Sequence, residues 1–307
     1  MKLVTLKRVI GEYFKDPVNV PEWKIVDSLD DPEFQDADAF FQINVPKVTK
    51  PNHKMRDYFE FFLTQKKPIL VCESSPFRKN LTDVDRSTAI MFRLGWDHYL
   101  RQGKFNNKNS PSDRWEKIKE QQSIKIKDWA LKEDGYILLC LQKPNDSSLN
   151  SLYVDYENYN KWIEDTVKLI RQYTDKPIKI RPHLKAKSVQ FSHLLDDTVT
   201  ESTVWKKRNI YEGGDSLEED LKDAYCVVAY NSNVLVESVC NGIPSIALSD
   251  ESIAWDVTNR IENIEQLNLN IDRTQWLYDI SYMVWSQDEI LNGKAWNHLK
   301  GVYFNEY

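Results

Sequence analysis

The sequence predicts an α/β protein with two domains, and three observations support this fold class. The chain has 307 residues, which is enough for two domains of ordinary size. Its apolar content of 41% is sufficient for packed cores and argues against extended disorder. In the second half, short apolar runs alternate with amphipathic segments and polar turns, which is typical of parallel strands joined by helices.

We expect one domain over residues 135–271. Residues 157–173 have the apolar spacing of an amphipathic helix, and a second helix follows Asn233 and ends before Gly242. Each expected strand is an apolar run that ends in a polar or Gly-Pro turn. These strands are Tyr136–Leu141, Pro177–His183, Ile210–Tyr211, Cys226–Ala229 and Ser245–Leu248.

The other domain is expected over residues 1–134. Apolar spacing predicts helices over 55–65 and 84–101, and residues 102–128 form a long polar insertion. Two apolar runs predict strands on either side of the first of these helices. They are Ala39–Val45 and Lys67–Cys72.

Charge and cysteine usage limit the possible functions. The net charge of −6 argues against a general nucleic-acid-binding protein. Residues 1–150 hold 25 Lys and Arg against 22 Asp and Glu, a net charge of +3, whereas residues 151–307 hold 16 against 25, a net charge of −9. The positive excess lies in residues 47–132, where it would attract an anionic acceptor, although a solvated surface of mixed charge is the simpler interpretation.

The four cysteines lie far apart in apolar surroundings and lack the spacing of a metal site. They predict reduced core thiols in a cytoplasmic protein without a metal ion. The sequence has no apolar run of transmembrane length and no signal peptide at its start, so we expect no membrane association.

Three turns of the second domain carry polar side chains where predicted strands end. In an open parallel sheet such turns meet at one edge, which is where ligands bind. Lys143 and Arg181 would neutralise a diphosphate, Ser232 would hold phosphate oxygens at a helix N-terminus, and Glu237 would accept hydrogen bonds from sugar hydroxyls. The candidate donor-binding residues are Gln142, Lys143, Arg181, His183, Ser232, Asn233 and Glu237.

A structural interpretation of the same residues is an Arg181–Glu237 ion pair and a helix cap at Ser232. Because three turns in one α/β half carry such groups, ligand binding is favoured over this alternative.

The first domain offers two candidates for a catalytic base. Glu73 follows a predicted strand, and Asp97 lies in the segment Gly95–Tyr99; either carboxylate would deprotonate an acceptor hydroxyl. A structural salt bridge with Arg78 would explain Glu73 equally well. Aromatic rings provide faces for stacking with a sugar or base. The candidate acceptor-binding residues are Arg78, Trp96, Tyr99 and Trp115.

Several enzyme classes lack their motif in this chain. The sequences GxxxxGK[ST] and GxGxxG are absent, which argues against a P-loop NTPase and a dinucleotide-dependent dehydrogenase. The absence of GxSxG and HExxH removes the motif support for an α/β-hydrolase or a zincin.

Three segments together resemble the GT-B class of nucleotide-sugar glycosyltransferases. They are RPH at 181–183, YNSNVLVESVCNGIPSIAL at 230–248, and the Trp-rich DRTQWLYDISYMVWSQDEI within the closing segment 272–307. The resemblance covers residues 136–307 well and the first 135 residues thinly. It implies two Rossmann-like domains that face each other across a cleft, with the closing segment forming helices that cross back to the first domain. It assigns donor-site roles to Arg181, His183, Ser232, Asn233 and Glu237.

Two groups within this class compete. LLCLQKPNDSSL, IRPHL and SNVLVESVCNGIP resemble capsule and lipopolysaccharide transferases of the Kdo-transferase type. IRQYTDKPIKIRPH and WLYDISYMVWSQDEILNGKAW resemble phage-encoded glycosyltransferases, some of which glucosylate hydroxymethylated bases in DNA. The basic stretch 47–132 favours the phage group.

The resulting prediction is a cytoplasmic enzyme, in the host cytoplasm if it is phage-encoded. It transfers a hexose, glucose in the first instance, from a UDP-sugar to a hydroxymethylpyrimidine in DNA. It requires no cofactor and is a monomer or weak dimer. The alternatives are a surface-polysaccharide glycosyltransferase and a non-catalytic module that binds nucleotide sugars.

Overall fold

The computed structural model describes residues 2–7, 10, 14, 20–50, 56–77, 91–183, 189–203 and 216–304. The chain forms two compact units. Unit 1 comprises residues 1–123 and 274–307, and unit 2 comprises residues 124–273. Arg78 and the strand predicted at Ile210–Tyr211 lie outside the described residues.

Unit 1 is built on a six-stranded mixed sheet in the order β11-β5-β4-β3-β1-β2. The first four strands of the chain run parallel, β5 runs antiparallel to β4, and β11 runs antiparallel to β5. The strands are β1 (Leu3–Leu6), β2 (Trp23–Val26), β3 (Ala39–Ile43), β4 (Ile69–Ser74), β5 (Met91–Trp96) and β11 (Val284–Ser286).

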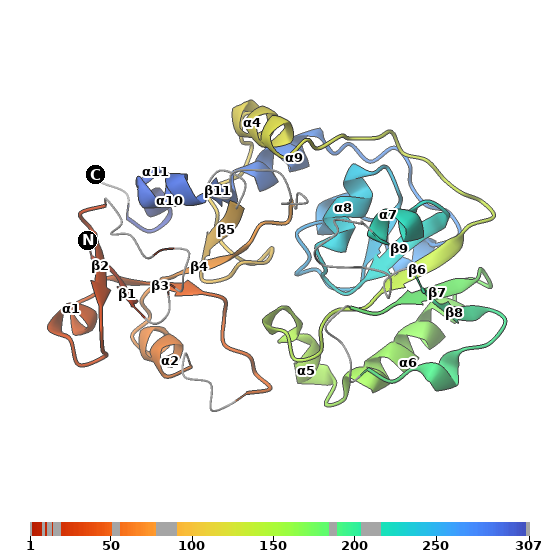
Figure 1. Cartoon of the computed structure of the whole chain (residues 1–307), viewed down its shortest axis with the longest axis horizontal. Coiled ribbons are helices and arrows are strands. Elements are labelled where there is room, and N and C mark those ends of the chain that lie inside the picture. Colours follow the sequence, from red (N-terminus) through yellow and green to blue (C-terminus); the bar gives the residue numbers. More distant parts are fainter. Residues whose placement is uncertain are drawn as a thin grey trace. The chain divides into compact units, whose positions relative to one another are not determined.

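Both faces of this sheet are covered by helices. Tyr58 and Phe62 belong to the core on one face, and Trp296 and Leu299 belong to the core on the other. The C-terminal elements, blue in Figure 1, therefore return to the sheet of the N-terminal strands, as predicted. The helices of unit 1 are α1 (Pro32–Gln35), α2 (Arg56–Thr64), α4 (Asp113–Gln121), α9 (Thr274–Ser281), α10 (Gln287–Leu291) and α11 (Lys294–Leu299).

The structure corrects three predictions in unit 1. The helix expected over 84–101 is wrong for Met91–Trp96, which form β5. The expected polar insertion contains α4, and Trp285 lies in a strand, β11, instead of a helix. All six residues of β5 are buried. A strand buried on both faces lacks the alternation of apolar and polar residues by which a half-exposed strand is recognised.

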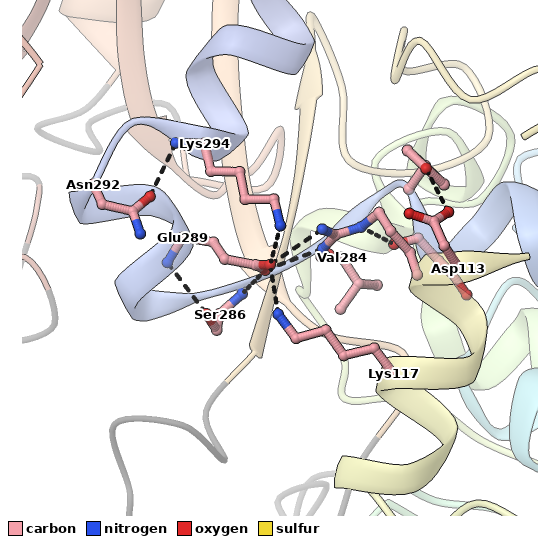
Figure 2. A network of polar contacts seen from close by, with 10 residues as sticks. Asp113, Lys117, Val284, Ser286, Glu289, Asn292 and Lys294 are labelled. Atoms are coloured by element: carbon pink, nitrogen blue, oxygen red, sulfur yellow. Dashed lines mark hydrogen bonds and ion pairs between the residues drawn. The ribbon is translucent and has the colours of Figure 1, made fainter. Parts of the chain in front are cut away.

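A buried ion-pair network connects α4 to the C-terminal segment (Figure 2). The guanidinium of Arg114 donates to both carboxylate oxygens of Glu289, at 3.2 and 3.1 Å, and Lys117 donates to the same carboxylate at 2.9 Å. Lys294 lies 3.5 Å from it. Glu289 also completes a capping box with Ser286 at the start of α10. Because the Arg114 side chain is only 6% exposed, loss of Glu289 would leave a buried guanidinium without this carboxylate.

Unit 2 contains a five-stranded, fully parallel sheet in the order β10-β9-β6-β7-β8. Its long helix α6 and the short helix α8 lie on opposite faces (Figure 1). The strands are β6 (Tyr136–Cys140), β7 (Ile178–Arg181), β8 (Val199–Glu201), β9 (Ala224–Ala229) and β10 (Ser245–Ala247). The helices are α5 (Leu152–Asp155), α6 (Tyr159–Arg171), α7 (Ser216–Leu221) and α8 (Val234–Cys240).

Among the residues that the structure describes, no helix is both long enough and apolar enough to cross a bilayer.

Candidate functional site

The strand order of unit 2 reverses between β6 and β9. The chain moves from β6 to β7 and β8 on one side, then returns to place β9 and β10 on the other. In open parallel sheets, the carboxyl ends of the strands at such a reversal form the ligand-binding crevice. Gln142 follows β6 and Asn231 follows β9, so both lie at this point of the sheet.

Gln142 and Asn231 bind each other across the reversal. Nε2 of Gln142 donates to Oδ1 of Asn231 at 2.9 Å, and the backbone N–H of Asn231 donates to Oε1 of Gln142 at 3.1 Å. Nε2 of Gln142 also donates to Oγ of Ser148 at 3.0 Å. Since Oε1 faces an N–H, the orientation of the Gln142 amide is fixed. The two residues are 8% and 2% exposed, so this pair is a rigid part of the site.

A carboxylate from the loop after β10 joins this pair. Oε2 of Glu251 accepts from Oγ of Ser151 at 2.6 Å and from Nδ2 of Asn231 at 3.4 Å. The hydroxyl groups of Ser151 and Tyr230 lie 3.0 Å apart. Burial raises the pKa of Tyr230, so its hydroxyl stays protonated at neutral pH. Polar groups from three strand-end loops therefore meet at one place.

Sequence reasoning missed Ser151, Tyr230 and Glu251. Tyr230 directly follows β9, and Glu251 lies four residues beyond the end of β10. The rule that selected Gln142 would have selected these two residues, whereas Ser151 lies well beyond the end of β6, at the start of α5.

Arg181 ends β7, beside β6. Its register partner is Cys140, the last residue of β6. Its guanidinium forms an ion pair with Asp220 of α7, whose carboxylate also accepts from the hydroxyl of Ser202 at 2.9 and 2.7 Å. The side chains of Arg181 and Asp220 are 12% and 1% exposed. Asp220 thus fixes the position of the Arg181 charge at the edge of the sheet.

The thiol of Cys140 is buried at the end of β6, beside Arg181. Burial raises its pKa to about 12; Arg181 opposes this rise, and Asp220 and Glu237 add to it.

The remaining predicted donor-binding residues occupy the loops at this edge. Oγ of Ser232 accepts from the N–H of Val234 at 3.3 Å, and Asn233 is the N-cap residue of α8. Lys143 and His183 follow β6 and β7 and are partly exposed. Among the predicted donor-binding residues, Gln142 directly contacts a second strand-end loop, through Asn231.

The two candidate bases of unit 1 lie at opposite ends of strand β4. Glu73 is near the carboxyl end of β4, whereas Asp97 is hydrogen-bonded to Ile69, the first residue of the same strand. Because ligands of open α/β sheets bind at the carboxyl ends of the parallel strands, only Glu73 lies at the expected edge. Its Oε1 accepts from the N–H and the hydroxyl of Ser74, at 2.7 and 2.9 Å.

The contacts of Asp97 are those of a residue that stabilises the fold. Its φ of 68° is in the left-handed region, and its backbone N–H donates to the carbonyl of Ile69 at 2.7 Å. Its Oδ2 accepts from Lys104 at 2.9 Å and from the hydroxyl of Tyr303. These contacts explain the residue as the anchor of a turn and of the C-terminal segment.

The aromatic residues predicted to contact the acceptor are buried. Trp96, Tyr99 and Trp115 are 0%, 1% and 4% exposed. Nε1 of Trp96 donates to the carbonyl of Leu299 at 2.8 Å, and Trp115 packs against Phe77 with ring centroids 5.7 Å apart. A buried ring presents no face to a sugar, so these residues act as core residues.

The part of the chain that the structure describes contains no group of three or more His, Cys, Asp or Glu side chains arranged to hold a metal ion.

Comparison with known proteins identifies the fold. No family model and no curated protein matches the chain. The structure is similar to that of Thermosulfurimonas dismutans KpsC, beta Kdo 2,4 transferase, with a TM-score of 0.50 and 12% sequence identity over 92% of this chain and 90% of that chain. The chain has a GT-B fold. A second structure, Thermosulfurimonas dismutans KpsC, beta Kdo 2,7 transferase, gives a TM-score of 0.42 at 12% identity, covering 95% of this chain and 97% of that one.

Unit 2 is a Rossmann-like unit with a fully parallel sheet. The hydrogen-bonded pair Gln142 and Asn231 lies at the reversal of its strand order. Unit 1 combines the N-terminal strands with the C-terminal segment.

Proposed function

We propose that this protein is a glycosyltransferase that takes its sugar from a nucleotide-sugar donor bound by unit 2. The observation that carries this proposal is the polar group at the strand-order reversal, where Gln142, Asn231 and Glu251 meet. The two buried amides hold the partly exposed carboxylate of Glu251 in place, and this carboxylate can accept hydrogen bonds from a ligand with many hydroxyls. The fold neighbour named as a Kdo transferase supports the same class of reaction.

Arg181 supplies the positive charge that a departing phosphate needs. Its ion pair with Asp220 holds the guanidinium at the carboxyl end of β7. A guanidinium binds phosphate oxygens in a bidentate manner, and Lys143 adds a second cation in the loop after β6. Both groups stabilise the negative charge that develops on the leaving nucleotide. The carboxylates of Glu237 and Glu251 accept hydrogen bonds from ribose and sugar hydroxyls.

Unit 1 binds the acceptor, and Glu73 is its general base. The acceptor oxygen attacks the anomeric carbon of the donor sugar, and the bond from that carbon to the phosphate oxygen breaks. Glu73 takes the proton of the attacking hydroxyl, while the bonding electrons leave with the nucleotide. The net result is one new glycosidic bond, one nucleotide and one proton.

Two acceptor classes follow from separate observations. The first is a surface glycan, since the similar solved structure is named as a Kdo transferase. The second is a hydroxymethylated pyrimidine in DNA, which the basic stretch 47–132 favours. For the second class the base would have to leave the duplex, at a cost of a few kcal/mol.

The decisive experiment measures donor consumption and product mass. The purified protein is incubated with UDP-glucose or nucleotide-activated Kdo, together with a capsule-type oligosaccharide or hydroxymethylcytosine-containing DNA. Formation of a glycosylated product supports the proposal and identifies the acceptor. A donor that binds but is never consumed with any acceptor would instead indicate a non-catalytic binding module.

Variants connect this activity to the site. Asn231→Ala should lower product formation at least about tenfold, because Gln142 and Glu251 lose a hydrogen-bonding partner. Asn263→Ala is the matched control, since Asn263 is exposed on the same unit. Equal rates for both variants would contradict the assignment of the site.

A further inference from the structure

The carboxyl end of β3 contains a buried amide with an unused acceptor. Gln42 is 1% exposed, and its Nε2 donates to the carbonyl of Asn44 at 2.6 Å. Because a carbonyl can only accept, this bond fixes which end of the amide is the oxygen. Oε1 of Gln42 is buried and has no hydrogen-bond partner within the described ranges. Asn44, whose carbonyl accepts this hydrogen bond, is partly exposed.

Gln42 and Glu73 lie on the same face of the sheet. Phe40, two residues before Gln42, stacks on Phe62 of α2 at 4.8 Å. Val71, two residues before Glu73, belongs to the same core cluster and is the register partner of Gln42. Since side chains alternate along a strand, both polar residues continue this face toward the carboxyl edge. The two residues lie on neighbouring strands and are offset by two positions, so their backbones are roughly 8 Å apart.

Two further polar atoms in the same condition lie in the loop after β3 and at the start of α2. Oγ1 of Thr49 and Nε of Arg56 are buried and lack a hydrogen-bond partner among the residues described. Nη2 of Arg56 donates to the carbonyl of Lys47 at 3.0 Å, which ties this side chain to the loop. The end of β3, the loop after it and the start of α2 thus hold one acceptor, one hydroxyl and one donor that have no hydrogen-bond partner among the described residues.

An unsatisfied buried polar atom destabilises a fold, and its retention therefore calls for an explanation. We infer that Gln42 is a specificity-determining residue for the acceptor: its Oε1 accepts a hydrogen bond from a second hydroxyl of a sugar whose reacting hydroxyl is deprotonated by Glu73. This inference rests on the proposed function. Two polar side chains on one face of the sheet could contact two hydroxyls of one sugar, whereas a hydroxymethyl group offers a single hydroxyl.

The test compares Gln42→Met with wild type in two reactions. Donor hydrolysis by water, without acceptor, measures the donor half of the site; transfer to a saccharide acceptor measures both halves. We expect unchanged hydrolysis and an acceptor KM about 10- to 100-fold higher, because the variant retains the shape but loses the oxygen. The thermal midpoint should stay close to wild type, since a lost hydrogen bond to Asn44 is offset by removal of the unsatisfied atom.

Gln35→Met is the matched control. Gln35 also lies in unit 1, and its Nε2 donates to a backbone carbonyl, that of Leu29, at 2.8 Å, but it is exposed and distant from the end of β3. Its acceptor KM should equal that of wild type. If Gln42→Met lowers the thermal midpoint and leaves the acceptor KM unchanged, Gln42 is structural and the inference is overturned. If wild type consumes no donor, the proposed function itself has failed, which is a separate outcome.

Discussion

Gln142 and Asn231 are 89 residues apart in sequence and exchange two hydrogen bonds where the strand order of unit 2 reverses. The pair joins the loop after β6 to the loop after β9. Both loops reach the candidate donor site, so this contact fixes the polar groups on either side of it. Its loss should affect donor binding and stability together.

Gln142→Met tests this link. Removal of the amide leaves the N–H and Oδ1 of Asn231 without these partners in a buried setting. We expect the free energy of unfolding to fall by about 1–3 kcal/mol and the KM for the donor to rise about tenfold. Denaturant unfolding and initial-rate kinetics measure the two effects. Gln172→Met, at an exposed position of the same unit, should change neither.

Arg181→Ala should remove turnover and also destabilise unit 2. Asp220 is 1% exposed and would keep a buried charge without its guanidinium partner, at a cost of about 3–5 kcal/mol. The double variant Arg181→Ala with Asp220→Asn should recover part of this stability, because no buried charge remains, but none of the activity. Recovery of activity in the double variant would show that Arg181 serves only the fold.

Glu73→Gln separates the two candidate bases. Loss of general-base catalysis should lower kcat about 10²- to 10⁴-fold while donor affinity, measured by calorimetry, stays the same. Asp57→Asn is a control at an exposed acid of the same unit. Asp97→Asn should instead lower the thermal midpoint and retain kcat, since Asp97 bonds to Lys104 and to the strand start at Ile69. The opposite pattern would make Asp97 the base.

The stability of unit 1 should depend on pH through Glu289. Burial raises the pKa of this carboxyl group, but the hydrogen bonds and charges of Arg114 and Lys117 outweigh burial and lower the pKa from 4.5 to about 2. Because the folded-state pKa is the lower one, ionised Glu289 stabilises the fold above about pH 4.5, by about 3 kcal/mol. This contribution is lost as the pH falls toward 2.

Glu289→Gln should therefore be less stable than wild type at pH 7, and the difference should shrink between pH 4.5 and 2. Denaturant unfolding across this pH range measures the difference. Asp288→Asn, at the exposed neighbouring position, should show little of this dependence. A constant difference at all pH values would disprove the role of the carboxylate charge.

The four thiols should be unreactive in the folded protein. All four are buried, and burial raises the pKa of each, to about 12 for Cys140 and Cys240. A chromogenic disulfide reagent at neutral pH should therefore label none of them until guanidinium is added, after which all four react. Rapid labelling of the native chain would contradict their burial. The full set is Cys72, Cys140, Cys226 and Cys240.

The sequence by itself determined many local elements of unit 2 and their approximate limits, although not the short strand β8. Helix α6 and strands β6 and β9 lie where apolar spacing predicted them, because amphipathic helices and buried parallel strands leave strong short-range patterns. It also placed Gln142 and Arg181 at strand ends, which was sufficient to expect a shared edge.

Tertiary structure alone decided which polar groups meet. Strand order brings Glu251 to Asn231, places Asp220 beside Arg181, and separates Glu73 from Asp97 at opposite ends of strand β4. It also made a strand of Met91–Trp96, whose pairing with β4 and β11 overrides its local spacing. The physical reason is that local periodicity records which face of an element is buried, whereas strand order and register arise from contacts between segments far apart in the chain.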